Sequence, residues 1–130
     1  MKVAVYYNLH KHVFSLQSRD KETYGRVVEH SEHVILKNAN FVVRKKGREK
    51  VLKEKTKNVH AFVVGEVIQG LPSGKEHSTE VPVVYNPYKG SSFVKKTTKE
   101  PVYNSDYAVL RLGPLDNKPL VSAYKVSHYD

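Results

Sequence analysis

Alternating apolar and polar residues predict β-strands along most of this chain. Residues 2–17 alternate with a period of two and predict a hairpin. Residues 24–43 continue with three further short β segments, separated by the sequences HSE and KNAN. Residues 59–68 are largely apolar on both faces, which is typical of a central strand. Gly65 inside that strand indicates a bulge or a close backbone approach.

The run RKKGREKVLKEKTK, residues 44–57, breaks this alternation and predicts a helix. Arg, Glu, Lys and Leu are good helix formers, and Glu49 precedes Lys53 at a spacing of four residues. Because the apolar stripe is narrow, we expect one short helix of about 10–13 residues, lying on a sheet with its lysines largely in water. Glu49 and Glu54 interrupt the positive charge, which indicates a solvated face and not a dedicated DNA arm.

The second half of the chain predicts further strands around a long loop. EVPVVYN has the composition of a strand, residues 87–106 form the loop, and YAVLRLG with PLVSAYKV predict a closing hairpin. A loop of this length is more often functional than idle, and it could act as a lid. The pattern therefore predicts a single α+β domain, residues 1–130. We expect a mainly antiparallel sheet in two hairpin-rich halves, with one short basic helix packed on it.

Composition narrows the classes of function. At 130 residues, with 39% hydrophobic and 27% charged residues, the chain fits one globular domain. It has no cysteine, which removes disulfides and thiolate nucleophiles. No apolar run approaches the length of a signal peptide or a membrane span, so we expect a soluble intracellular protein. A net charge of +9 favours anionic partners without choosing among them.

Motifs for catalysis and metal binding are weak. GLPSGKE departs from a phosphate-binding loop in its spacing, and Glu76 stands where that motif has Ser or Thr. His10 and His12 have a spacing that metals use, with His30 and His33 as possible completing ligands, but ordinary histidines are the better interpretation. No serine lies in a strand-to-helix turn typical of a nucleophile, and no pair of carboxylates for acid–base catalysis is apparent. We therefore expect a binding protein that is not an enzyme and has no metal or cofactor.

The segment YNPYKGSSFVKK, residues 85–96, has the residue types that bind nucleotides. Tyr88 and Phe93 could stack on a base, Asn86 could read its edge, and the lysines could meet phosphate. The alternative is that Tyr85 and Phe93 pin the loop to the sheet while the lysines stay in water, and composition does not decide between the two.

Two arginines lie inside predicted strands and not in charge runs. An arginine in a half-buried strand needs an anionic partner, so we expect a carboxylate or a phosphate beside Arg26 and beside Arg111. A structural salt bridge is the commoner explanation for either residue.

Three segments together resemble a known group of small phage proteins. They are VYYNLHKHVFSLQS, the stretch from GRVVEHSEHVILKNANFVV to NVHAFVVGEV, and YNPYKGSSFV. Residues 2–112 resemble the Thoeris anti-defence family called Tad one, most clearly in Asn-Leu-His at 8–10 and in residues 57–61.

The resemblance implies a sponge that captures a cyclic ADP-ribose isomer made by the TIR-domain enzyme of a bacterial defence system. It implies that no bond is broken and that other cyclic nucleotides are further ligands. A homo-oligomer, either dimer or hexamer, would act in the cytoplasm of the infected bacterial host. Carried over to this sequence, Phe93 or Tyr88 would stack, Asn104 or Asn86 would supply the amide, and Arg111 would bind phosphate. The resemblance implies an arginine at the position of Lys57, and a lysine there weakens a bidentate contact.

Two other functions fit the same residues. The net charge of +9 also suits a nucleic-acid-binding phage protein. Edge strands or the basic helix also suit a protein-protein inhibitor of a host enzyme. A gel shift across a salt series and a pull-down from host lysate would separate these alternatives from a small-molecule sponge.

Overall fold

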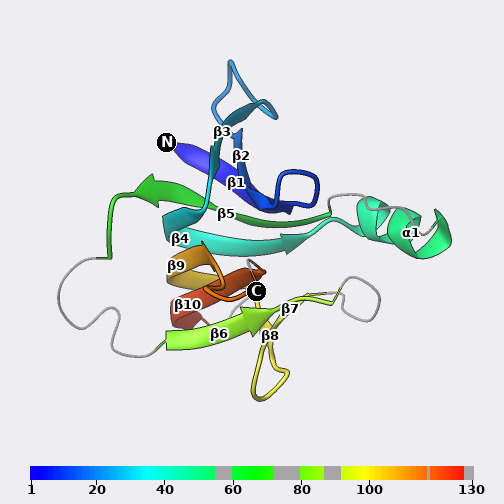
Figure 1. Cartoon of the computed structure of the whole chain (residues 1–130), viewed down its shortest axis with the longest axis vertical. Helices are drawn as coiled ribbons and strands as arrows, with labels where there is room; N and C mark the ends of the chain where they lie inside the picture. The colour runs from blue at the N-terminus through cyan, green and yellow to red at the C-terminus, as the bar shows by residue number, and fades with distance from the viewer. Residues whose placement is uncertain (55–59, 72–79, 87–91, 117, 128–130) are drawn as a thin grey trace.

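One antiparallel sheet contains all the strands that the structure describes. The computed structural model describes residues 1–54, 60–71, 80–86, 92–116 and 118–127. The strand order across the sheet is β3-β2-β1-β5-β4-β9-β10-β6-β7-β8 (Figure 1). The strands are β1 (Lys2–Asn8), β2 (Val13–Ser18), β3 (Val27–Ser31), β4 (His33–Val43), β5 (Ala61–Ile68), β6 (Glu80–Val84), β7 (Phe93–Lys95), β8 (Pro101–Val102), β9 (Asn104–Leu112) and β10 (Pro119–Ser127). The helix is α1 (Lys45–Glu54).

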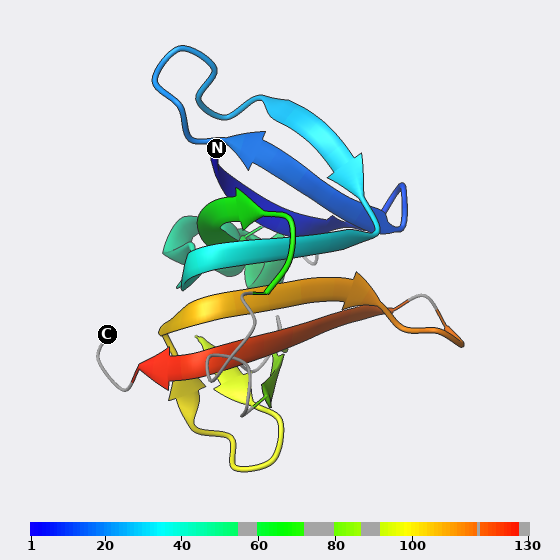
Figure 2. The same ribbon diagram turned by 90° about the vertical axis from the view of Figure 1, so that its left-hand side faces the viewer.

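The predicted hairpins and the predicted central strand are present. β1 pairs with β2 from Val3↔Ser18 to Asn8↔Val13, and β9 pairs with β10 at the other end of the chain. β5 lies between β1 and β4, as its apolar residues on both faces predict. Figure 2 shows the β1–β2 pair on one side of β4 and the β9–β10 pair on the other.

β4 corrects one prediction and confirms another. We expected KNAN to separate two strands, but β4 runs without a break through this sequence. Asn38 takes a left-handed conformation with φ 53°, and the register with β5 shifts between Lys37 and Asn40. Asparagine tolerates that conformation, so the sequence forms a bulge inside a strand and not a turn. Gly65 faces this bulge, where an added Cβ would lie 2.9 Å from the Lys37 carbonyl oxygen, so the predicted close approach is confirmed.

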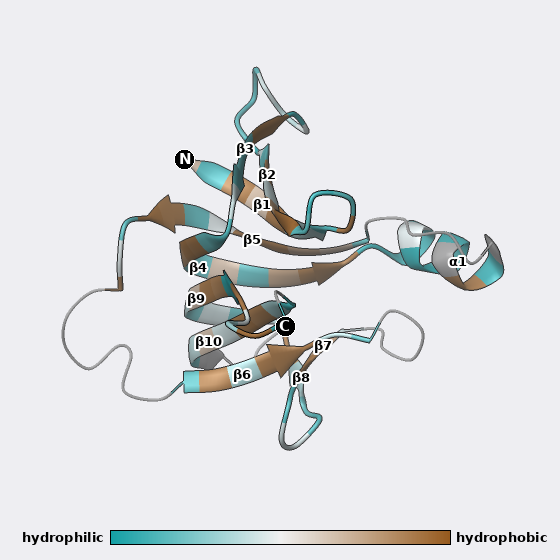
Figure 3. Cartoon of the chain, in the orientation of Figure 1, coloured by the Kyte–Doolittle hydropathy of each residue, from teal (hydrophilic) through white to brown (hydrophobic). Residues whose placement is uncertain are grey.

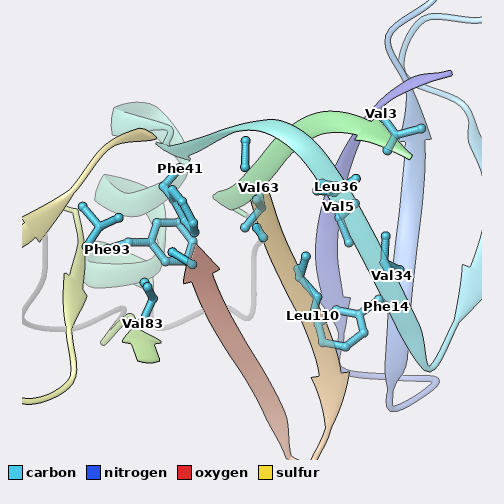
Figure 4. Close-up of a cluster of buried hydrophobic side chains, with 14 of the residues drawn as sticks. Val3, Val5, Phe14, Val34, Leu36, Phe41, Val63, Val83, Phe93 and Leu110 are labelled. Carbon is cyan, nitrogen blue, oxygen red and sulfur yellow. The ribbon is translucent and has the colours of Figure 1, made fainter. Parts of the chain in front are cut away.

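The hydrophobic core lies on one face of the sheet. Phe14, Leu36 and Leu110 on this face are almost fully buried (Figure 4). In the described part of the chain no helix lies across this face, so the sheet must curl over itself to bury it. Figure 3 shows apolar residues alternating with polar residues along the strands, as one buried face requires.

α1 lies beyond the ends of β4 and β5 and not across a face of the sheet (Figure 1). We expected it packed on the sheet, but its sequence offers little apolar surface for that, and Leu52 is 40% exposed. No helix within the described residues is long and apolar enough to cross a membrane.

The predicted loop 87–106 is in part a hairpin at the sheet edge. β7 and β8 pair through Phe93↔Val102 and Val94↔Pro101, and β9 begins at Asn104. Phe93 and Val102 anchor this hairpin because both side chains are buried in the core. Residues 87–91 lie outside the described residues, so the structure tests the proposed lid only over residues 92–106.

Candidate functional site

A cluster of aromatic and polar side chains lies where β6 ends and α1 leaves β4. It consists of Phe41, Arg48, His60, Tyr85 and Phe93, and we call it the Tyr85 site. These residues come from β4, α1, the residue before β5, the residue after β6, and β7. Strand pairing therefore brings together side chains that are up to 52 residues apart in the sequence.

Three aromatic rings form the base of the Tyr85 site. The Phe41 and Phe93 ring centroids lie 5.3 Å apart with the rings edge to face (Figure 4). The Tyr85 ring lies 5.2 Å from the Phe93 ring with a tilt of 36°. Phe93 is 7% exposed and Phe41 is 6% exposed, whereas Tyr85 is half-buried. Phe41 and Phe93 thus support the site from the core, and Tyr85 carries its accessible ring.

His60 connects this aromatic base to the backbone of α1. Its Nε2 atom lies 2.9 Å from the Tyr85 hydroxyl, and the His60 side chain is buried. The Arg44 amide donates a hydrogen bond of 2.7 Å to the His60 carbonyl oxygen just before the helix begins. The residue that directly precedes α1 is therefore fixed to the same residue that holds Tyr85.

Arg48 brings a positive charge to the Tyr85 hydroxyl. Burial raises the pKa of Tyr85 above its ordinary value, while the charge of Arg48 and a side-chain hydrogen bond from it act to lower the pKa. Burial is the larger influence, so the phenol stays neutral at physiological pH. A neutral hydroxyl beside a guanidinium and an imidazole can donate to or accept from a ligand.

Arg44 directly precedes α1, and its carbonyl oxygen accepts a hydrogen bond of 3.0 Å from the Arg48 amide. The two arginines therefore lie on one side of the helix, because residues four apart share a helix face. The Arg44 guanidinium lies 4.5 Å from the centroid of the Phe62 ring, a cation–π contact. The Phe62 ring also contacts the Tyr6 ring, and the two ring centroids lie 5.8 Å apart. Two arginines therefore dock the helix on aromatic rings at the end of the sheet.

The predicted site residues fall into three groups. Phe93 lies in the Tyr85 site, and Asn86 follows Tyr85 directly with its side chain exposed. Asn104 lies nearby at the start of β9, two residues after Val102, the partner of Phe93. Lys57 and Tyr88 lie outside the described residues.

Arg111 and Arg26 lie far from the Tyr85 site. Arg111 is seven residues along β9 from Asn104, about 24 Å at the rise of an extended strand. It pairs with Leu120 of β10 and with His33 of β4. Its charge also lowers the pKa of Tyr124, which burial and then Glu80 raise. Arg26 precedes β3 at the opposite edge of the sheet. The structure therefore does not bring these two arginines to the predicted loop.

Sequence reasoning missed Arg48 and the role of His60. Inside a run of basic residues, nothing in the sequence separates the arginines that turn inward from the lysines in water. The spacing of Arg44 and Arg48 indicates that they share one helix face, but it does not say whether that face meets the sheet. The aromatic residues that receive them come from distant strands.

A serine and a histidine meet elsewhere in the molecule. The Ser15 Oγ lies 2.9 Å from His30 Nδ1 and accepts a hydrogen bond of 3.0 Å from the Asn8 side-chain amide. Ser15 is completely buried, so its hydroxyl is out of reach of a substrate. The contact is consistent with a structural hydrogen bond between β1, β2 and β3.

The remaining cavity and metal candidates are poorer. A shallow groove of about 260 Å³ at the start of β4 is lined by residues that include Glu29, His33 and Ile68. Across the described ranges, no three His, Cys, Asp or Glu side chains gather closely enough to hold a metal ion. His10 and His12, which we expected on one side of a strand, lie in the turn between β1 and β2.

Comparison with known proteins gives the family. Residues 1–114 match the family model described as Mycobacterium phage L5 gene 82 protein. The chain belongs to this family. It is 40% identical to the Gene 82 protein of Mycobacterium phage L5 over 116 residues, which cover 85% of this chain and 90% of that protein. No solved structure matches the chain.

Family membership supports the expectation of a phage protein and goes no further. The family description names neither a ligand nor an activity. The resemblance to the Tad one family gains no support from these matches, so the capture of a cyclic nucleotide stays a proposal.

Proposed function

We propose that this phage protein binds a small phosphate-bearing nucleotide at the Tyr85 site and holds it without chemical conversion. The ligand class is that of cyclic ADP-ribose isomers, with cyclic oligonucleotides as further ligands. By sequestering such a host signal in the bacterial cytoplasm, the protein would act against a Thoeris-type defence, as the resemblance to the Tad one family implies.

The observation that carries the proposal is the meeting of Arg48, Tyr85 and His60 above a buried aromatic base. A nucleotide needs a cation for its phosphate, an aromatic plane for its base, and polar groups for its edges. Arg48 offers the cation, and Tyr85 offers both a partly exposed ring and a neutral hydroxyl. The exposed amide of Asn86 is adjacent to Tyr85 in the chain.

The preorganisation of the site supports tight capture of a ligand. Tyr85 is held by His60 at 2.9 Å and by the Phe93 ring at 5.2 Å, so its ring is positioned before a ligand arrives. A preorganised site loses less side-chain entropy on binding, which favours affinity.

A thermal-shift series with cyclic ADP-ribose and cyclic dinucleotides tests the proposal. At ligand concentrations about 100 times the Kd, binding stabilises the native state by about 2.7 kcal/mol. For a chain of this size, that corresponds to a rise in Tm of roughly 10 °C. We expect Arg48→Ala to abolish most of the shift and Arg48→Lys to restore only part of it, because lysine lacks the bidentate fork.

The matched control is Lys118→Ala, which removes one positive charge from the exposed turn after β9. It should keep the full thermal shift. Chromatography of the ligand released by heating should return it unaltered. A converted ligand would show an enzyme, and no shift with any cyclic nucleotide would refute the proposal.

A further inference from the structure

The outward face of α1 carries a row of lysines. Lys46, Lys50 and Lys53 are spaced four and three residues apart, so they share one face of the helix. All three side chains are exposed. We call them the lysine stripe, and it spans about 10 Å along the helix axis at 1.5 Å per residue.

The lysine stripe faces away from the Tyr85 site. Lys46 comes two positions after Arg44, and Lys50 two positions after Arg48, which corresponds to a rotation of about 200° around the helix. Arg44 lies over the Phe62 ring and Arg48 meets Tyr85, so this pair turns toward the sheet. The stripe therefore points outward from a helix that already projects beyond the strands (Figure 1).

The charges of α1 only partly favour the stability of the helix. It contains five basic residues and no acidic residue in its first turn, where negative charge would suit the helix dipole. Lys46 and Lys50 repel each other at a spacing of four residues, and Gly47 is a poor helix former. Among the described residues the recorded ion pair is Lys95 with Glu100, so Glu49 forms none with the stripe. Lys53 in the last turn suits the helix dipole and Glu49 has a favourable spacing to it, so helix stability explains part of this arrangement and leaves Lys46 and Lys50 unexplained.

Although Glu49 and Glu54 interrupt the basic run in the sequence, the three exposed lysines of the stripe share one helix face. We infer that this lysine stripe binds the phosphate backbone of double-stranded nucleic acid, independently of base sequence. Lysines are point charges suited to phosphate, and the stripe has no Asn, Gln or Arg to read base edges. It has no aromatic residue on which unstacked bases could stack, so a duplex fits better than a single strand. The net charge of +9 would draw the chain toward any such polymer.

The lysine stripe shares no residue with the Tyr85 site, so this inference is tested independently of the proposed nucleotide binding. Its measure is the salt dependence of binding, since each neutralised phosphate contributes about 0.9 to the slope of log K against log salt. Three lysines thus account for a slope of about 2.7, which is roughly a 40-fold loss of affinity between 50 and 200 mM salt.

The experiment measures fluorescence anisotropy of a labelled 20-base-pair duplex with the full chain over that salt range. We expect Lys46→Gln/Lys50→Gln/Lys53→Gln to lower the slope by about 2.7. Replacing the same residues by Arg should keep it. The control Lys37→Gln/Lys96→Gln/Lys118→Gln removes three exposed lysines outside α1, so it matches the loss of net charge. Circular dichroism establishes that each variant is folded.

We expect the salt slope of duplex binding to fall in the helix variant and not in the control variant. The single-stranded form of the same oligonucleotide should bind more weakly than the duplex. Equal losses in the helix and control variants would overturn the inference, because net charge alone would then explain binding. An unchanged slope in the helix variant, no duplex binding at 50 mM salt, or tighter binding of the single strand would overturn it as well.

Discussion

Truncating Phe93 tests whether this residue is part of the core or part of a ligand-stacking surface. Its ring is 7% exposed and contacts the rings of both Phe41 and Tyr85. Removing a buried Phe ring costs about 3–5 kcal/mol through lost transfer energy and the remaining cavity. We take about 4 kcal/mol for Phe93→Ala, because two ring contacts are lost as well.

Urea denaturation followed by circular dichroism measures this loss. With an m value of about 2 kcal/mol/M, the midpoint should fall by roughly 2 M. β7 is three residues long and β8 is two, and Phe93 holds them to the core, so trypsin should also cleave faster after Lys95 and Lys96.

Two comparison variants make the result interpretable. Val84→Ala, on the neighbouring strand and 37% exposed, should cost less than about 1 kcal/mol. Phe93→Leu keeps most of the volume and should cost less than about 1.5 kcal/mol. We expect Phe93→Leu to keep nucleotide binding, because the core covers the ring. A loss under about 1.5 kcal/mol for Phe93→Ala, or a stable Phe93→Leu protein without affinity, would refute the assignment of Phe93 to the core.

Two further predictions concern Tyr85 and Gly65. The raised pKa of Tyr85 means that the fold favours the neutral phenol. The contribution of the neutral Tyr85 side chain to stability is therefore present below a pH of about 10 and is lost as the pH rises through the folded-state pKa. The stability advantage of the wild type over Tyr85→Phe should hold from pH 7 to 9 and shrink above 10 in thermal melts; growth of that advantage above pH 10 would contradict the sign. Gly65→Ala would place a Cβ 2.9 Å from a backbone oxygen and should cost about 1–3 kcal/mol in denaturant melts. Gly70→Ala has nothing within 4 Å of the added Cβ and should be neutral or slightly stabilising; equal effects of the two changes would contradict the close-approach argument.

The strands were predictable where side-chain alternation met a buried face. The β1–β2 and β9–β10 hairpins and the central position of β5 follow from period-two patterns and from apolar residues on both faces. β4 was predicted as two segments because asparagines also form turns, and only pairing with β5 shows that Asn38 makes a bulge. The β7–β8 hairpin was missed because strands of three and two residues are too short for a visible period.

The candidate site was predictable in type and only partly in position. The aromatic and amide segment around residue 85 was identified from its composition, and it lies at the Tyr85 site. Arg111 and Arg26 were proposed as phosphate contacts because of their residue type, and strand topology places them far from it.

By itself the sequence determined an antiparallel β protein with one basic helix, a positive charge and an aromatic segment, because these follow from local periodicity and composition. Only the tertiary structure decided which charges meet which rings. The curl of the sheet brings Phe41 and Phe93 beneath Tyr85, and α1 then turns Arg44 and Arg48 inward and leaves the lysine stripe outward. A helix has two faces, and the sequence alone does not say which of them meets the sheet.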